Sequence, residues 1–260
     1  MKPTIFAPVL ISAAVAACSS TVSPTNDPPL LSYTAFTARG DSLTIAGKLD
    51  AFRTALGGSL NAPNAPPAAS GRREINWDGV PPALTNVDNF PLKFFNVNSK
   101  RGVEYRTTGT GLRVDSTSFQ SFNPGLGDQF KPFSGKKLFA PVGSNQVSVD
   151  FKLAGAPTAG LVNGFGVVFS DVDLVGSTRI ELFDGAGVRI ANLEAAASPG
   201  SHGFSFLGAV FASPVVASAR ITSGDAALDG TTTDVSAGGT KDLVAMDDFV
   251  YGEPQPIPHP

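Results

Sequence analysis

Short runs of alternating apolar and polar residues fill the chain from residue 146 onward. In residues 146–153, Val147, Val149 and Phe151 fall on one side of an extended strand, and the polar residues between them fall on the other. Such alternation is typical of strands with one buried and one solvent-facing side. The runs that indicate strands are residues 146–153, 164–169, 179–183, 188–191, 203–207, 215–221 and 243–251.

Seven such runs with no helices between them predict an all-β fold, an antiparallel two-sheet sandwich of the jelly-roll type. The segment Asp184-Gly185-Ala186-Gly187 between two of the runs predicts a hairpin turn. The composition fits this fold, because 19 Phe can fill a core while 28 Gly and 21 Pro supply turns.

One short helix is expected near the start of the domain. The apolar residues that recur there at helical spacing are Ile45, Leu49, Phe52 and Leu56. Asp41 or Ser42 can cap the beginning of this helix, and Gly57 with Gly58 can end it. The sequence therefore predicts a helix over residues 42–56.

The N-terminus has the pattern of an export signal. A single positive charge at Lys2 precedes an uncharged, mostly apolar run over residues 5–17, which is too short to span a bilayer. Val15-Ala16-Ala17 before Cys18 resembles a bacterial lipobox, which predicts cleavage and lipidation at Cys18 and anchoring to the outer membrane. The alternative is an ordinary secretory signal that contains a cysteine. Cys18 is the only cysteine, and lipidation would account for a thiol that has no disulfide partner.

The chain divides by composition into four parts. We expect residues 1–17 to be the signal peptide and residues 18–34, rich in Ser, Thr, Pro and Asn, to be a flexible tether. Residues 35–252 are expected to form a single β-sandwich domain. Residues 253–260 alternate proline with other residues, which predicts a tail outside the sheets.

The number and distribution of charged residues argue against a nucleic-acid partner. The chain has 19 Lys and Arg against 22 Asp and Glu, and its basic residues are scattered. Binding to phosphate backbones requires a concentrated basic face. Arg72 and Arg73 are adjacent, and we expect them to be a solvated pair; the alternative is an anion site.

Four segments together resemble a group of exported bacterial β-sandwich proteins. These segments are RREINWDG at 72–79, FFNVNS at 94–99, GFGVVFSDVD at 164–173 and MDDFVYG at 246–252. The resemblance covers about residues 35–252. It implies a single exported β-sandwich and implies no catalytic residue.

The chain is also similar, more loosely, to lectin-like and carbohydrate-binding jelly rolls. In those folds a closing strand with an Asp-Asp pair often helps to hold a structural calcium ion, and Asp247 with Asp248 stands at the corresponding place. The resemblance implies a glycan partner. The chain departs from the sugar-binding pattern because it has one Trp and three Tyr for stacking on sugar rings.

Two acid pairs are candidate calcium ligands. On a regular strand Asp247 would share a side with Phe249 and Tyr251, and Asp248 would take the other side, so one acid would point inward. A buried carboxylate requires an ion, amide donors or a proton, and calcium accepts six to eight oxygen ligands. Asp171 and Asp173 would share a side if extended. For both pairs the alternative is a solvated or amide-bonded carboxylate.

Trp77 and Asp78 are candidate ligand-binding residues, because a tryptophan beside polar groups can form a platform for a sugar ring. The alternative is a core or rim tryptophan whose ring nitrogen is bonded locally. His202 lies in Gly-Ser-His-Gly, and we expect it to be a turn residue. No Gly-x-Ser-x-Gly elbow surrounds any serine, so a Ser-His-Asp triad is not indicated.

These features favour a non-catalytic, membrane-anchored binding or structural module of the cell envelope, with a glycan as the expected partner. The alternative is a glycoside hydrolase with paired carboxylates, because such sites leave little local signature. Glu74, Glu104 and Glu181 are the first candidates for that chemistry.

Overall fold

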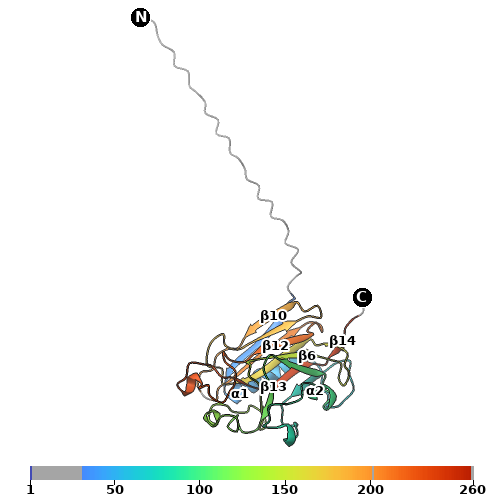
Figure 1. Cartoon of the computed structure of the whole chain (residues 1–260). Helices are drawn as coiled ribbons and strands as arrows, with labels where there is room; N and C mark the ends of the chain where they lie inside the picture. The colour runs from blue at the N-terminus through green and yellow to red at the C-terminus, as the bar shows by residue number, and fades with distance from the viewer. Residues whose placement is uncertain (2–30, 201, 259–260) are drawn as a thin grey trace. The chain divides into compact units, whose positions relative to one another are not determined.

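The computed structural model describes residue 1, residues 31–200 and residues 202–258 (Figure 1). All helices and strands lie in the unit formed by residues 31–260. The predicted signal peptide and lipidation site at Cys18 lie outside the described residues. The predicted tether extended to residue 34, but strand β1 already begins at Tyr33. Among the described residues, no helix combines the length and the apolar character needed to cross a membrane.

Two antiparallel sheets form the domain, which confirms the predicted sandwich. Sheet A has the order β1-β11-β8-β13-β5-β4, with β2 also paired to β13, and sheet B has the order β10-β9-β12-β6-β3. The strands of sheet A are β1 (Tyr33–Gly40), β2 (Arg72–Ile75), β4 (Gly111–Asp115), β5 (Leu138–Val142), β8 (Gly164–Ser170), β11 (Phe204–Phe211) and β13 (Ala245–Gly252). The strands of sheet B are β3 (Val103–Thr107), β6 (Gln146–Phe151), β9 (Arg179–Phe183), β10 (Arg189–Glu194) and β12 (Ser218–Thr222).

Short elements connect these strands. Strands β7 (Gly160–Leu161) and β14 (Gln255–Pro256) pair with each other outside the two sheets. The helical turns are α2 (Phe94–Val97) and the 3-10 turns η1 (Pro82–Leu84), η2 (Pro124–Leu126) and η3 (Val235–Ala237). The predicted hairpin joins β9 to β10, where the Asp184 amide donates to the Val188 carbonyl at 2.9 Å.

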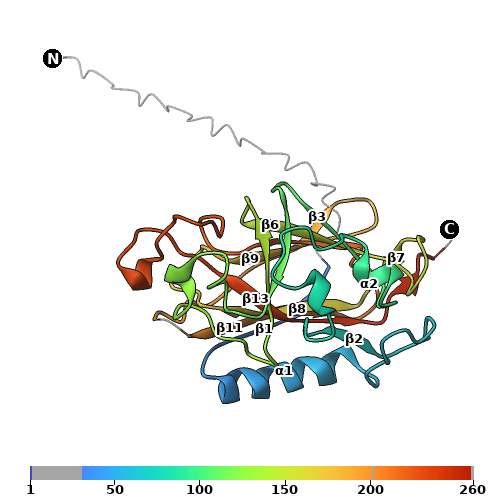
Figure 2. The ribbon, with the colours of Figure 1, turned by 60° about the horizontal axis from the view of Figure 1, so that its bottom comes forward.

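Helix α1 (Ser42–Leu56) has the predicted bounds. The Asp41 side chain caps it by accepting the Thr44 amide at 2.9 Å. It packs on the outer side of sheet A, away from β6 and β9 (Figure 2). Its buried side chains are Ile45, Leu49, Phe52 and Leu56. Burial of one such side chain stabilises the fold by about 1.5–3 kcal/mol, so this apolar side fixes the helix to the sheet.

Two glycines let the helix approach the sheet closely. Gly166 of β8 and Gly208 of β11 are paired across the strands. A Cβ at either position would lie about 3 Å from the ring of Phe52, at 3.0 Å and 2.9 Å respectively. The pair therefore forms a hollow in sheet A that seats this ring, and a side chain at either position would displace it.

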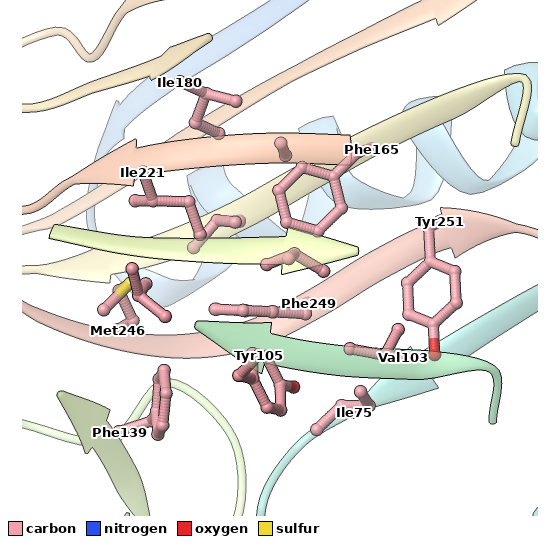
Figure 3. Close-up of a cluster of buried hydrophobic side chains, with 14 of the residues drawn as sticks. Ile75, Val103, Tyr105, Phe139, Phe165, Ile180, Ile221, Met246, Phe249 and Tyr251 are labelled. Carbon is pink, nitrogen blue, oxygen red and sulfur yellow. The ribbon is translucent and has the colours of Figure 1, made fainter. Parts of the chain in front are cut away.

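The core between the sheets is rich in aromatic rings. Its members include Tyr105 of β3, Phe165 of β8 and Phe249 of β13 (Figure 3). The Phe165 and Phe249 rings meet edge to face at 5.6 Å. The alternation predicted for residues 146–153 is confirmed as far as Phe151, where β6 ends, because Val147, Val149 and Phe151 all point into this core.

Strand β13 contains a bulge that changes the expected faces of its residues. Met246 pairs with Phe169 and Phe249 pairs with Val167, so Asp247 and Asp248 together oppose a single residue of β8. Such a bulge breaks the period-two alternation. Met246 and Phe249 consequently both point into the core. The expectation that Asp247 shares a side with Phe249 is therefore wrong.

The domain extends beyond the expected end at residue 252. Glu253 is buried, and its carboxylate accepts hydrogen bonds from the Arg73 side chain at 2.5 and 2.9 Å. The guanidinium of Arg73 also donates to the carbonyls of Ala62 and Lys100, both at 3.1 Å. The expectation that Arg72 and Arg73 are a solvated pair is wrong for Arg73, which is 0% exposed.

We expect the substitution Arg73→Met to lower the free energy of unfolding by about 3–5 kcal/mol, because it leaves the Glu253 carboxylate buried without its partner. Urea unfolding measures this difference. Arg106→Met is the matched control, since the Arg106 side chain is 65% exposed in its ion pair with Asp150. The control should cost less than about 1 kcal/mol. Equal losses in the two variants would contradict the prediction.

Candidate functional site

The acid pair of strand β13 lies on the outer side of sheet A. One Asp247 carboxylate oxygen accepts the amides of Phe133 and Ser134, at 2.6 and 3.1 Å. The Asp248 carboxylate accepts the Ser134 hydroxyl at 2.5 Å, and its other oxygen lies 3.9 Å from the Arg53 guanidinium. The bulge and the loop at residues 133–134 together create this arrangement.

This pair does not fit a calcium site. Burial, together with the neighbouring charge of Asp248, raises the pKa of Asp247 well above its ordinary value. Burial also raises the pKa of Asp248. Amides and a hydroxyl bond two of the four oxygens, and Asp247 Oδ1 has no hydrogen-bond partner. The fourth oxygen lies 3.9 Å from the Arg53 guanidinium, which would repel a cation. The arrangement matches the alternative of amide-bonded strand acids.

A second acidic cluster gathers at the end of strand β8. It contains the predicted pair, Asp171 and Asp173, together with Asp234, which caps the short turn η3. One ligand atom from each of the three lies within 4.8 Å of the others, and all three side chains are buried. We call these three residues the acid cluster. Sequence reasoning did not single out Asp234, because it comes from a loop far along the chain.

Hydrogen bonds hold each member of the acid cluster in place. Asp173 accepts the Gly200 amide at 2.7 Å. Asp234 accepts the amides of Ser236 and Leu243, both at 2.7 Å. One oxygen of Asp171 and one oxygen of Asp173 are buried without a hydrogen-bond partner.

The electrostatics of the acid cluster disfavour its charged state. Burial, reinforced by the charges of Asp173, Asp234 and Asp242, raises the pKa of Asp171 to about 8. Burial also raises the pKa values of Asp173 and Asp242. Within the described part of the chain, no Lys or Arg forms an ion pair with any of these acids. The acid cluster has the donor set of a metal-ion site.

Trp77 and Asp78 do not form a ligand platform. Trp77 is 1% exposed, its ring stacks on Phe139 at 4.0 Å, and its ring nitrogen donates to the Asp247 carbonyl at 2.7 Å. The Asp78 carboxylate accepts the Lys136 amide at 2.8 Å and so fixes a turn. The ligand-binding interpretation of Trp77 is wrong, because the residue belongs to the core.

The candidate carboxylates for hydrolysis lie apart and are already engaged. Glu74 of β2 accepts two hydrogen bonds from Arg53, at 3.0 and 2.7 Å. Despite burial, the hydrogen bonds from Arg53 and Arg72 lower the pKa of Glu74, which is opposite to the shift that a general acid needs. Glu104 and Glu181 lie in β3 and β9, with β6 and β12 between them.

His202 is the turn residue that we expected. It is exposed and has a φ of 71°, in the left-handed region. Its amide donates to the Gln129 carbonyl at 3.2 Å. Its contacts are therefore those of a loop residue.

The outer side of sheet B presents a polar surface that sequence reasoning did not single out. Its strands alternate, so the residues between the core positions of β3, β6, β12 and β9 point outward. We call this surface the polar sheet face. Its outward residues are Glu104, Arg106, Gln146, Ser148, Asp150, Glu181, Phe183, Ser218 and Arg220.

Two adjacent hollows lie on the polar sheet face. The larger, of about 480 Å³, is lined by Leu92, Arg106, Thr107, Thr108, Gln146, Ser148 and Arg220. The smaller, of about 210 Å³, is lined by Arg106, Ser148, Phe183, Gly187, Ser218, Ala219 and Arg220. Arg106, Ser148 and Arg220 belong to both linings and form the boundary between them. Their side chains offer hydrogen-bond donors to either hollow.

Acids fix the arginines of the polar sheet face. Arg106 forms a bidentate pair with Asp150 at 2.5 and 2.7 Å. Arg220 lies 3.5 Å from the Glu181 carboxylate, and its guanidinium covers the Phe183 ring at 5.1 Å. A bidentate pair and a ring contact orient the planar guanidinium groups before a ligand arrives.

Comparisons with known structures find distant likenesses. A mutant of the family 29 carbohydrate-binding module CBM29-2 complexed with mannohexaose has 10% identity and a TM-score of 0.31, over 72% of this chain and 94% of that chain. A second CBM29-2 mutant has 13% identity and a TM-score of 0.25, over 51% and 89%. The enzymatically active domain of bacteriophage CBA120 tailspike protein 4 has 12% identity and a TM-score of 0.29, over 67% and 22%.

These TM-scores lie below 0.5, so the likenesses carry no argument about function. No protein family and no curated protein matches the chain.

We expect the substitution Asp247→Asn to make stability less dependent on pH. The native state holds the Asp247 proton more tightly than the unfolded chain does, so the free energy of unfolding falls as pH rises above the ordinary carboxyl pKa of about 3.9. Asparagine keeps one acceptor oxygen for the loop amides and removes this loss. Relative to the wild type, the free energy of unfolding of the variant should rise by up to about 1.4 kcal/mol per pH unit.

Urea unfolding between pH 5 and pH 8 in chelator measures this difference. The exposed carboxylate Asp128 provides the control, and Asp128→Asn should follow the wild type. Parallel pH profiles for the wild type and Asp247→Asn would refute the assignment of the buried proton.

Proposed function

We propose that this chain is a non-catalytic glycan-binding module of the cell envelope, anchored to the outer membrane through a lipid on Cys18, and that it binds glycan on the polar sheet face. The observation that carries the proposal is the pair of hollows bounded by Arg106, Ser148 and Arg220. Guanidinium, hydroxyl and amide groups are the donors and acceptors that sugar hydroxyls pair with.

The chemistry of the hollows supports binding by hydrogen bonds. The Arg106 side chain is 65% exposed and the Arg220 side chain is 48% exposed, so both can reach a ligand. The Arg220 guanidinium covers one face of the Phe183 ring, so that face is not available for stacking on a sugar. The affinity for a single sugar should therefore be weak, because aromatic stacking contributes little here.

The state of the acids supports binding over hydrolysis. A glycosidase needs one carboxyl group that stays protonated near neutral pH and faces the substrate. On the polar sheet face, Asp150 pairs with Arg106, and Glu181 pairs with Arg189 at 2.7 Å. The acids with raised pKa values, such as Asp171 and Asp247, are buried elsewhere at 0% exposure.

We expect a glycan array to identify a ligand for the protein lacking residues 1–18. Arg106→Ala and Arg220→Ala should each weaken binding to that ligand by about 10- to 100-fold, because each removes charged hydrogen-bond donors worth about 1.5–3 kcal/mol. Lys48→Ala removes the same charge from the exposed side of α1 and should leave binding unchanged. Full affinity in both arginine variants would place the ligand elsewhere.

The membrane anchor has its own test. Cells that express the full chain should incorporate labelled palmitate into it, and the protein should fractionate with membranes, because two or more acyl chains hold a protein stably at a bilayer. Cys18→Ser should abolish both labelling and membrane association. Continued labelling of this variant would overturn the lipidation proposal, and glycan binding would be unaffected by that result.

A further inference from the structure

Three segments that are distant in the sequence converge on the acid cluster. Asp171 and Asp173 follow strand β8, and Asp234 begins the turn η3 in the long loop after β12. The Gly200 amide reaches Asp173 from the loop before β11. The side chain of Asp242 fixes the chain beside the acid cluster, because it accepts the Asp173 amide at 3.2 Å and the Leu174 amide at 3.0 Å.

The unpartnered oxygens in the acid cluster require an explanation. Buried carboxylate oxygens normally accept hydrogen bonds, and each one left without a partner costs about 1–3 kcal/mol or more. Asp171 is 0% exposed and Asp173 is 8% exposed, yet Asp171 Oδ1 and Asp173 Oδ2 have no hydrogen-bond partner. These two oxygens belong to residues whose ligand atoms, with that of Asp234, lie within 4.8 Å of one another.

We propose that Asp171, Asp173 and Asp234 hold a structural calcium ion. Calcium–oxygen bonds of 2.3–2.6 Å allow two oxygens on one ion to lie up to about 5 Å apart, and the ligand atoms of the acid cluster satisfy this limit. The ion supplies the positive charge that these buried carboxylates lack. It also gives a partner to the free oxygens of Asp171 and Asp173.

The donor set favours calcium over other divalent ions. All three protein ligands are carboxylates, and the two histidines of the chain are not among them, so a zinc or copper site is not indicated. Magnesium requires a near-ideal octahedron at 2.0–2.1 Å, whereas calcium tolerates irregular geometry. An irregular site assembled from separate loops therefore suits calcium better.

Such an ion would link the segments at this edge of the sandwich. The chain after β8, the loop that carries Gly200 and the loop that carries Asp234 meet at the acid cluster. An ion that binds only the native state stabilises that state by mass action. At a hundredfold excess of calcium over its dissociation constant, the melting temperature should rise by roughly 5–10 °C.

The test uses the full chain after exhaustive treatment with chelator. Calcium chloride should raise its melting temperature, calorimetry should give one site per chain, and elemental analysis after dialysis against micromolar calcium should recover one ion. Magnesium chloride at the same concentration should give a smaller shift.

Asp171→Asn and Asp173→Asn are the informative variants. In each, the remaining oxygen can still accept the existing hydrogen bond from Gln129 or Gly200. Both variants should be at least as stable as the wild type in chelator, because each removes one of the clustered charges. Both should lose the calcium response or bind calcium at least tenfold more weakly. Asp247→Asn, which changes a buried acid outside the acid cluster, should keep the response.

Two results would overturn the proposal. The first is a wild-type protein whose melting and calorimetry are indifferent to calcium up to millimolar concentration and that retains no metal, which would mean that protons neutralise the acid cluster. The second is an undiminished calcium response in both asparagine variants, which would place the ion elsewhere. The melting temperatures of the variants in chelator show whether they are folded, so a lost calcium response can be distinguished from misfolding.

Discussion

The sandwich depends on the bulge in strand β13 more than on any other single feature. This strand pairs with β8, β5 and β2 and supplies inward side chains to the aromatic core. A regular strand with this sequence would turn Asp247 or Asp248 into that core, where a carboxylate would be surrounded by apolar side chains. The extra residue keeps both acids on the outer side of sheet A, where the loop amides of residues 133–134 donate hydrogen bonds to the Asp247 carboxylate. The same stretch of backbone offers the Asp247 carbonyl to the Trp77 ring nitrogen, so the bulge also fixes the centre of the core.

Elements that depend on local spacing could be predicted from the sequence. The helix over residues 42–56 and the strand that begins at Gln146 match their predicted starts, because apolar periodicity and capping residues act within a few positions of the chain. Strand β1 gave no such signal. It is an edge strand on which only Phe36 and Ala38 pack against the helix cluster and the other side stays exposed, so its alternation is short. A strand of this kind is defined by its pairing with β11 and not by its own side chains.

Features that depend on contacts between distant residues could not be predicted in the same way. Nothing near Arg73 indicates that a glutamate 180 positions later will pair with it in the interior. Two members of the acid cluster stand in one motif and could be proposed together, whereas Asp234 joins them only through the path of the loop after β12. The bulge could not be predicted from the sequence either, because an adjacent Asp pair is equally compatible with a regular strand. For the acid pairs the chemical need of a buried charge was visible and the residue that meets it was not, whereas for Arg73 neither the burial nor the partner could be foreseen.

The placement of charge divides the molecule into two regions with different physical requirements. On the polar sheet face, the exposed ends of Arg106 and Arg220 pair with Asp150 and Glu181 at the boundary with water, so these pairs orient side chains while adding little stability. In the acid cluster, burial makes each unpaired charge costly, and a partner is required. The backbone connects the two regions. The segment after Asp173 leads into β9, and the loop that carries Asp234 leaves β12, and these two strands are neighbours in sheet B. β12 carries Arg220 and β9 carries Glu181, so the segments that form the acid cluster are continuous with the two strands that hold this pair in register.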